Sequence, residues 1–188
     1  MHLLGTILVA CTLSSVLSAQ GTGTTSPGEV PGGDASDNGV WLDVPFFPQR
    51  ENGCGASSLA MVIQYWKSPP AGDPDVIFSS LYSEEQQGIP ASRLTEYLEA
   101  NGFHAFTFRG DLSEAKKHLL KGRPLIVSLK RSTLHYVVVV GFDEQEKVVL
   151  LNDPAVKKLS KMDEREFLKS WKPTDHWTLL AVPDGTLQ

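Results

Sequence analysis

One cysteine stands out among the side chains that could do chemistry. Apart from Cys11 near the start, Cys54 is the only cysteine of the 188-residue chain, and it lies between Gly53 and Gly55 where an apolar helical pattern begins. Unpaired backbone N–H groups and the helix dipole stabilise a thiolate at a helix N-terminus. The alternative is a buried structural cysteine. The flanking glycines, which permit close approach of a substrate, favour the nucleophilic interpretation.

A nucleophilic thiolate needs partners, and the chain supplies three candidates. His135 can take the thiol proton and return it to a leaving amine, and Asp153 can orient the imidazole. The side-chain amide of Gln49 and the backbone N–H of Cys54 are candidate donors to a tetrahedral oxyanion. Taken singly, His135 could be an ordinary strand residue and Asp153 an ordinary turn residue. Together with Cys54 they predict a site for covalent acyl chemistry.

The elements that must hold these residues follow from periodicity. A helix is predicted from Cys54 to Trp66, before Ser68-Pro69-Pro70, which cannot continue it. Further predicted elements are a helix over 90–100, a strand over 103–108, a helix capped by Asp111 or Ser113 and ending at Lys121, and a strand over 125–129.

The strongest strand pattern follows, over 135–142 and 148–152, and predicts an antiparallel hairpin. A turn centred on Glu144 would place His135 directly opposite Asp153, on the same face of the ladder. A capping box at 163–166 predicts a helix to Trp171, and a last strand is expected over 177–182. Helices followed by a mostly antiparallel sheet indicate an α+β domain.

The N-terminal sequence resembles an export signal. Residues 1–19 are interpreted as a signal peptide or lipoprotein leader, 20–39 as a flexible Ser/Gly/Thr/Pro-rich linker and 40–184 as the folded domain. Two alternatives stay open: lipidation of Cys11, which would tether the protein to a membrane, or cleavage near Ser18-Ala19-Gln20. Either predicts an exported protein, secreted, periplasmic or anchored at the cell envelope.

The composition of the chain argues against some classes of function. A net charge of −5 and a mixed composition describe one acidic globular domain and not a nucleic-acid binder. The histidines outside the predicted site, His104, His118 and His176, are assigned surface or packing roles. With one cysteine in the predicted domain and scattered histidines, the sequence predicts neither a metal site nor a cofactor.

Four segments together resemble cysteine peptidase family 39, a family of bacterial papain-like enzymes. They are Val44-Pro45-Phe46-Phe47-Pro48-Gln49, the run from Gly53 to Met61, His135-Tyr136-Val137-Val138-Val139, and Asn152-Asp153-Pro154. The resemblance spans about Trp41 to Val182. It implies a papain-like fold with Cys54 as nucleophile, His135 as base, Asp153 as orienting residue and Gln49 in the oxyanion hole.

The resemblance has limits. The family's best-known members are the N-terminal domains of bacteriocin exporters and cut leader peptides after a double glycine. They usually carry an acidic residue where this chain has Gly53, and this chain contains neither transmembrane helices nor a phosphate-binding loop. The expected function is a free-standing, exported thiol peptidase acting on a peptide or protein. A peptide-binding or envelope-interaction module on the same fold and an acyl or amide transferase are the alternatives.

Overall fold

The computed structural model describes residues 38–66 and 72–186. The predicted leader, most of the predicted linker and Cys11 lie outside these residues, as does Ser68-Pro69-Pro70. The predicted α+β class is confirmed: in this described part of the chain, five α-helices accompany an antiparallel sheet.

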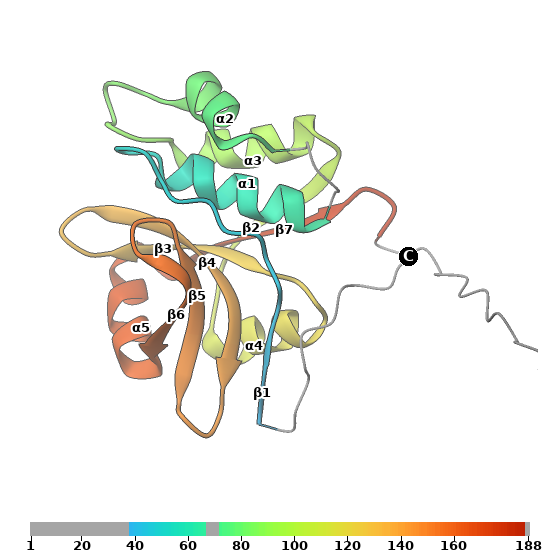
Figure 1. Cartoon of the computed structure of the whole chain (residues 1–188), viewed down its shortest axis with the longest axis vertical. Coiled ribbons are helices and arrows are strands. Elements are labelled where there is room, and N and C mark those ends of the chain that lie inside the picture. Colours follow the sequence, from blue (N-terminus) through green and yellow to red (C-terminus); the bar gives the residue numbers. More distant parts are fainter. Residues whose placement is uncertain (1–37, 67–71, 187–188) are drawn as a thin grey trace, which may run out of the picture.

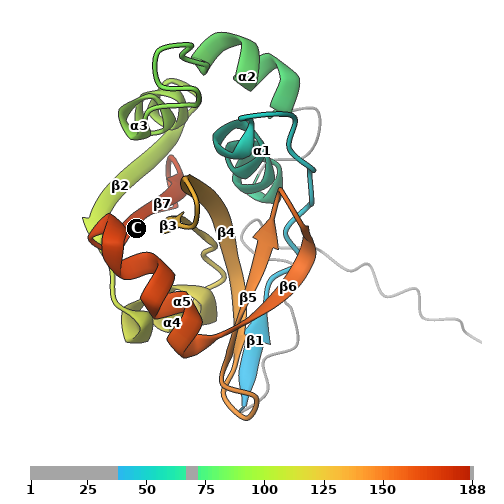
Figure 2. The same cartoon turned by 90° about the vertical axis from the view of Figure 1, so that its left-hand side faces the viewer.

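The helices fall into two groups (Figures 1 and 2). Both views show the first three together at one end of the molecule and the last two at the other. The first group is α1 (Cys54–Trp66), α2 (Pro74–Leu81) and α3 (Ala91–Ala100). The second is α4 (Leu112–Leu120) and α5 (Glu164–Trp171), and a 3-10 turn, η1 (Lys172–Thr174), follows α5.

A seven-stranded sheet connects the two groups. Its strand order is β2-β7-β3-β4-β5-β6, and β1 pairs separately with β4. The strands are β1 (Gly39–Trp41), β2 (Phe103–Arg109), β3 (Leu125–Lys130), β4 (Leu134–Asp143), β5 (Val148–Asp153), β6 (Lys157–Asp163) and β7 (Trp177–Pro183). Every pairing in this sheet is antiparallel.

Most predicted elements are confirmed within two residues. Helix α1 has the predicted bounds, and Asp111, rather than Ser113, caps α4 by accepting a hydrogen bond from Glu114 N at 2.9 Å. Four elements were not predicted: α2, β1, β6 and the 3-10 turn η1. Local signals for α2 exist, because Asp73 caps it and Pro74 opens its first turn. Strand β6 is rich in lysine and lacks alternation, which an edge strand tolerates.

Helix α1 is the centre of the hydrophobic core. Its run from Leu59 to Ile63 is at most 3% exposed, so the helix is buried on all sides and not on one stripe only. It packs against α2 and α3 on one side and against β4, β3 and β7 on the other. This packing fixes the first residue of the helix, Cys54, against the sheet.

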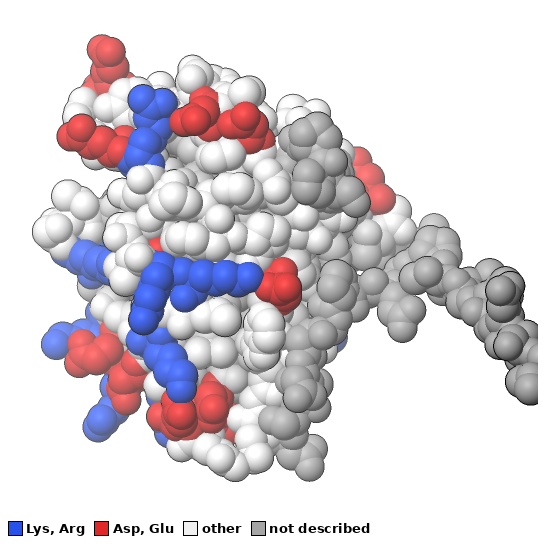
Figure 3. All heavy atoms as spheres, viewed as in Figure 1, with Lys and Arg blue, Asp and Glu red and all other residues white. Residues whose placement is uncertain are grey.

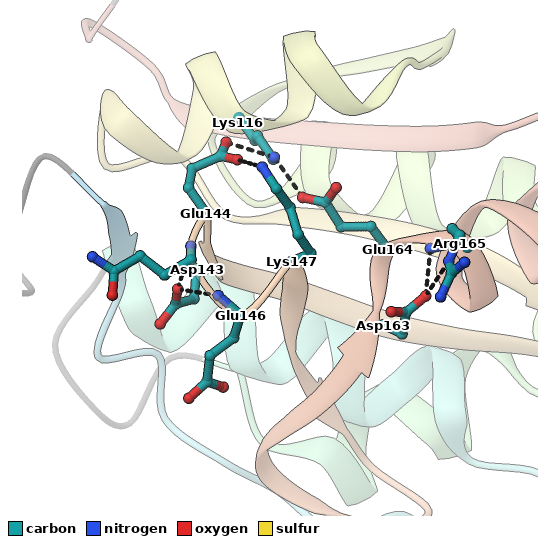
Figure 4. Close-up of polar contacts among 9 residues, drawn as sticks. Lys116, Asp143, Glu144, Glu146, Lys147, Asp163, Glu164 and Arg165 are labelled. Atoms are coloured by element: carbon teal, nitrogen blue, oxygen red, sulfur yellow. Dashed lines mark hydrogen bonds and ion pairs between the residues drawn. The ribbon is translucent and has the colours of Figure 1, made fainter.

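A charged cluster ties α4 to the β4–β5 turn and to α5 (Figure 4). Lys116 Nζ lies 2.6 Å from Glu144 Oε1 and 2.5 Å from Glu164 Oε1, and Lys147 Nζ approaches Glu144 Oε2 at 3.0 Å. Burial opposes the charge of Lys116, but the two carboxylates raise its pKa above the ordinary value. The cluster is remote from Cys54 and holds the second helix group on the sheet.

The surface mixes charges of both signs. Figure 3 shows Lys and Arg side chains gathered over the region of β5 and β6, with Asp and Glu side chains beside them. Two β6 lysines pair with carboxylates, Lys158 with Asp43 at 2.6 Å and Lys161 with Glu146. The lysines of β6 are therefore partly neutralised by their neighbours.

Candidate active site

The geometry around Cys54 begins with a tight turn. Asn52 adopts a left-handed conformation with φ of 56°, and Gly53 N donates to Arg50 O at 2.9 Å. The next helical bond, from Ser57 N to Gly53 O, starts α1. The turn thus places the thiol on the first residue of a buried helix, at its positive end.

His135 and Asp153 form the second half of the site. His135 Nε2 lies 2.8 Å from Asp153 Oδ1, and the two residues are 8% and 1% exposed. His135 and Cys54 line the same cleft, and hydrogen bonding and charge of His135 lower the pKa of the Cys54 thiol. Because Asp153 occupies Nε2, the nitrogen left for the thiol is Nδ1. The structure therefore brings Cys54, His135 and Asp153 together in that order.

The electrostatics favour a charged pair at the thiol. Burial raises the pKa of Cys54, but the hydrogen bond and charge of His135 and the N–H groups of Tyr136 and Gly55 bring it below the ordinary value. Burial lowers the pKa of His135, but hydrogen bonds with Asp153 and Cys54 raise it to about 9. Between these two ionisations the site holds a thiolate beside an imidazolium.

The predicted hairpin register was wrong by two residues, although the predicted contact is present. Val138 pairs with Asn152, so in this register Asp153 would stand opposite Val137 and not His135. Residues two apart on a strand share a face, and their side chains reach a diagonal partner. His135 therefore still meets Asp153.

A β-bulge makes this contact feasible. Nearer the turn, Gly141 pairs with Leu150, and that register, if continued, would set Asp153 opposite Val138 on the wrong face. The bulge between Val139 and Gly141 shifts the register by one residue and restores the face of His135. Gly141 is needed here because β1 passes closely: a Cβ on it would lie 2.3 Å from Val40 O.

Gln49 is held by Pro154, the residue that follows Asp153 at the end of β5. Its backbone N donates to Pro154 O at 2.9 Å. The buried Asn152 donates from Nδ2 to Val44 O at 3.1 Å and accepts from Leu159 N at 3.1 Å. Asn152-Asp153-Pro154 thus fixes the segment leading to Gln49 as well as the imidazole.

A cleft of about 510 Å³ contains the predicted residues. Cys54, His135 and Gln49 line it, and Asp153 lies behind the imidazole. The other lining residues are Asn52, Gln86, Gln87, Gly88, Ile89, Pro90, Ala91, Thr133, Leu134 and Tyr136. Apart from the Cys54 and His135 side chains, the walls consist of amides, apolar groups and hydroxyls.

Sequence reasoning missed two residues that contact the site. Arg131, in the turn between β3 and β4, pairs with Asp153 Oδ2. Asn152 was placed at the end of a predicted strand and in the Asn152-Asp153-Pro154 segment without any contact of its own, although it is fully buried. The sequence places Arg131 four residues before His135, and Asn152 directly beside Asp153. Neither spacing predicts a contact with the site.

His104, His118 and His176 do not line the cleft. His104 faces Asp184 at 3.6 Å on the surface, and His176 packs against Trp171 with ring centroids 5.0 Å apart. Within residues 38–66 and 72–186, no cluster of three or more His, Cys, Asp or Glu side chains could hold a metal ion. No helix in this described part is long and apolar enough to cross a membrane.

A family model and several solved structures match this chain. A family model described as "Peptidase_C39 like family" matches residues 41–178. No functionally curated protein matches the chain. Several solved structures match the chain. The three described next each match with a probability of 1.00.

Three of these structures illustrate the likeness. A C39-like peptidase from Bacillus anthracis is 19% identical over 78% of this chain and 98% of its own, with a TM-score of 0.61. A double-glycine-motif protease of an AMS/PCAT transporter, solved with its leader peptide, is 26% identical over 76% and 94%, with a TM-score of 0.61. The peptidase domain of Streptococcus ComA is 22% identical over 73% and 97%, with a TM-score of 0.57.

Proposed function

Because this chain belongs to the Peptidase_C39-like family, we propose that it hydrolyses peptide bonds through Cys54, His135 and Asp153. Both the family and the fold support the function of a cysteine peptidase. The observation that carries the proposal is the order of these residues: the carboxylate of Asp153 is hydrogen-bonded to the imidazole of His135, and the imidazole and the Cys54 thiol line the same cleft. A buried structural cysteine would need none of these partners.

The proposed reaction begins with attack of the Cys54 thiolate on the substrate carbonyl carbon. The carbonyl oxygen becomes an oxyanion, which Gln49 and the backbone N–H of Cys54 stabilise. As the C–N bond breaks, the imidazolium of His135 gives its proton to the leaving amine, and a thioester joins the acyl group to Sγ. His135 then takes a proton from water, which attacks the thioester, releases the acid and restores the thiolate.

Asp153 keeps the imidazolium charged and oriented. Replacing it with asparagine is expected to lower kcat on the order of 10⁴-fold, less than the loss of the nucleophile. Donors surround the carboxylate: His135 and Ala155 N approach Oδ1, and Arg131 approaches Oδ2. An asparagine cannot present an acceptor on both sides, so its NH₂ group faces either the imidazole or the guanidinium.

Steady-state kinetics of Asp153→Asn beside Asp184→Asn would check this. Asp184 faces His104 at the surface, so the control applies the same change outside the cleft. Unchanged kcat in Asp153→Asn would contradict the orienting role.

The substrate class proposed is a peptide whose residues next to the scissile bond are uncharged. Apart from the triad's own Cys54 and His135, no ionisable side chain except the Tyr136 phenol lines the cleft, and burial and the charge of Cys54 raise the pKa of Tyr136 to about 12. A charged substrate residue would lose hydration without gaining a partner.

A peptide library digested by the purified protein and read by mass spectrometry tests the proposed function and this preference together. We expect cleavage, with kcat/KM lower by about tenfold or more for Lys or Glu beside the cut. Cleavage preferentially beside charged residues would contradict the substrate class, and absence of any cleavage would count against hydrolysis.

We also propose that the protein is exported. The support is the sequence alone: the short apolar run Leu3–Ala10, followed by Cys11 or by the small residues before Gln20. Intact mass of the protein recovered from its native host would distinguish lipidation of Cys11 from cleavage after Ala19, and an unprocessed cytoplasmic chain would overturn export.

A further inference from the structure

The turn between β3 and β4 carries a charged residue that reaches the back of the site. Arg131 N donates to Thr133 O at 2.9 Å and closes the turn, and His135 follows at the start of β4. The Arg131 side chain extends to Asp153 Oδ2. It is 38% exposed, whereas the Asp153 side chain is 1% exposed. A guanidinium in contact with solvent thus pairs with a buried carboxylate.

The two oxygens of Asp153 have different partners. Oδ1 accepts from His135 Nε2 at 2.8 Å and from Ala155 N at 3.0 Å. Oδ2 accepts from Arg131 Nη2. Because the carboxylate is buried, loss of the guanidinium would leave Oδ2 desolvated and would favour the protonated acid or a rotated carboxylate. Either change weakens the acceptor that His135 requires.

Other charged groups around Asp153 do not replace Arg131. His135 on β4 is the group being oriented, and Cys54 on α1 lies beyond the imidazole. Lys157 on β6 is the register partner of Asp153, but its side chain is exposed. Burial raises the pKa of Asp153, while His135, Arg131 and the Ala155 N–H bring it below the ordinary value.

We propose that Arg131 is a positioning residue of the active site, which fixes Asp153 Oδ2 so that Oδ1 faces the imidazole and the carboxyl stays ionised. The inference rests on the proposed function, because it concerns the same Cys54–His135–Asp153 arrangement. Arg131 does not line the cleft, although its neighbours Thr133 and Leu134 do. It acts through Asp153 and makes no contact with substrate.

The test compares Arg131→Met, Arg131→Lys and the control Lys130→Met, which removes a positive charge from the adjacent exposed residue. For Arg131→Met we expect the Asp153 carboxyl, followed by ¹³C NMR, to titrate about one pH unit higher than in the unmodified protein. Protonation of Asp153 removes the counter-ion of the imidazolium, so the acid limb of Cys54 alkylation should also move to higher pH. We expect kcat to fall by about tenfold to a hundredfold with KM nearly unchanged.

Arg131→Lys should recover part of the loss, because an ammonium supplies the charge but not the fixed planar geometry. In an Asp153→Asn background, Arg131→Met should have little further effect. An Asp153 titration and an acid limb that match the unmodified protein in both Arg131 variants would overturn the inference. An effect of Lys130→Met equal to that of Arg131→Met would overturn it too, because general surface charge would then be the cause.

The same measurements distinguish failure of the proposed function from failure of this inference. If Cys54 of the unmodified protein reacts like a free thiol while Asp153 still titrates higher in Arg131→Met, Arg131 positions the carboxylate and catalysis fails. If Cys54 is activated and Arg131→Met leaves both titrations unchanged, the proposed function survives and this inference fails.

Discussion

Replacing Cys54 with alanine is expected to abolish peptide hydrolysis, with kcat lowered on the order of 10⁶-fold. The thiolate is the atom that becomes bonded to the acyl group, and the chain has no second cysteine among residues 38–66 and 72–186 to replace it. The fold should persist because alanine suits the first turn of a helix and Cys54 is not part of the fully buried core. Steady-state hydrolysis of a cleaved library peptide measures the effect.

The matched control for this variant is Ser58→Ala, one turn further along α1. Ser58 Oγ is buried and finds no hydrogen-bond partner in the described part of the chain, so its removal should leave stability and activity nearly unchanged. A Cys54→Ala protein that retains activity, with circular dichroism and melting like those of the Ser58→Ala control, would contradict the proposed nucleophile.

Replacing His135 with alanine is expected to produce a loss of similar size. The imidazole has two tasks: as a cation it stabilises the thiolate, and as an acid it protonates the leaving amine. Without it, only the N–H groups of Tyr136 and Gly55 still oppose the effect of burial, so the pKa of the Cys54 thiol should rise. His104→Ala, which removes a surface imidazole outside the cleft, should keep full activity.

The same pair determines the pH dependence of the unmodified protein. As pH falls, the thiolate of Cys54 becomes protonated below the ordinary thiol range, and activity is lost. As pH rises through the His135 pKa of about 9, the imidazolium loses its proton and the leaving amine loses its acid. A plot of kcat/KM against pH should therefore be bell-shaped. His135→Ala activity that equals the unmodified protein at every pH would exclude the histidine from the mechanism.

The secondary structure was largely predictable because most helices and strands are marked by residues within or directly beside them. Helix α1 is bounded by Gly53 and by the prolines after Trp66, and the valine-rich strands β4 and β5 flank a polar turn. Strand β6 was not predictable in this way. It forms because β5 offers a partner, and Asn152 Oδ1 accepts from Leu159 N, where Leu159 adopts a φ of 52°. Support of this kind, from the neighbouring strand and from one side chain, leaves no periodic pattern in β6 itself.

The site was predictable in its residue types and not in its geometry. The sequence identifies Cys54, His135 and Asp153 as candidates, but their meeting depends on the bulge between Val139 and Gly141, where β1 also passes close to Gly141. The partners of Asp153 and Gln49 follow from the fold as well. Arg131, in the β3–β4 turn, and Asn152, near the end of β5, have side-chain directions that are set only when the sheet is formed.

The most direct test of the central claim is the reactivity of Cys54 itself. Protein from about residue 38 is treated briefly with iodoacetamide at pH values from about 4 to 9, and intact mass reports the alkylated fraction beside His135→Ala. We predict rapid alkylation well below the free-thiol pKa of about 8.5 in the unmodified protein, and its loss in the variant. Slow alkylation that rises only near pH 8.5 in both proteins would contradict an activated thiol and with it the proposed peptidase.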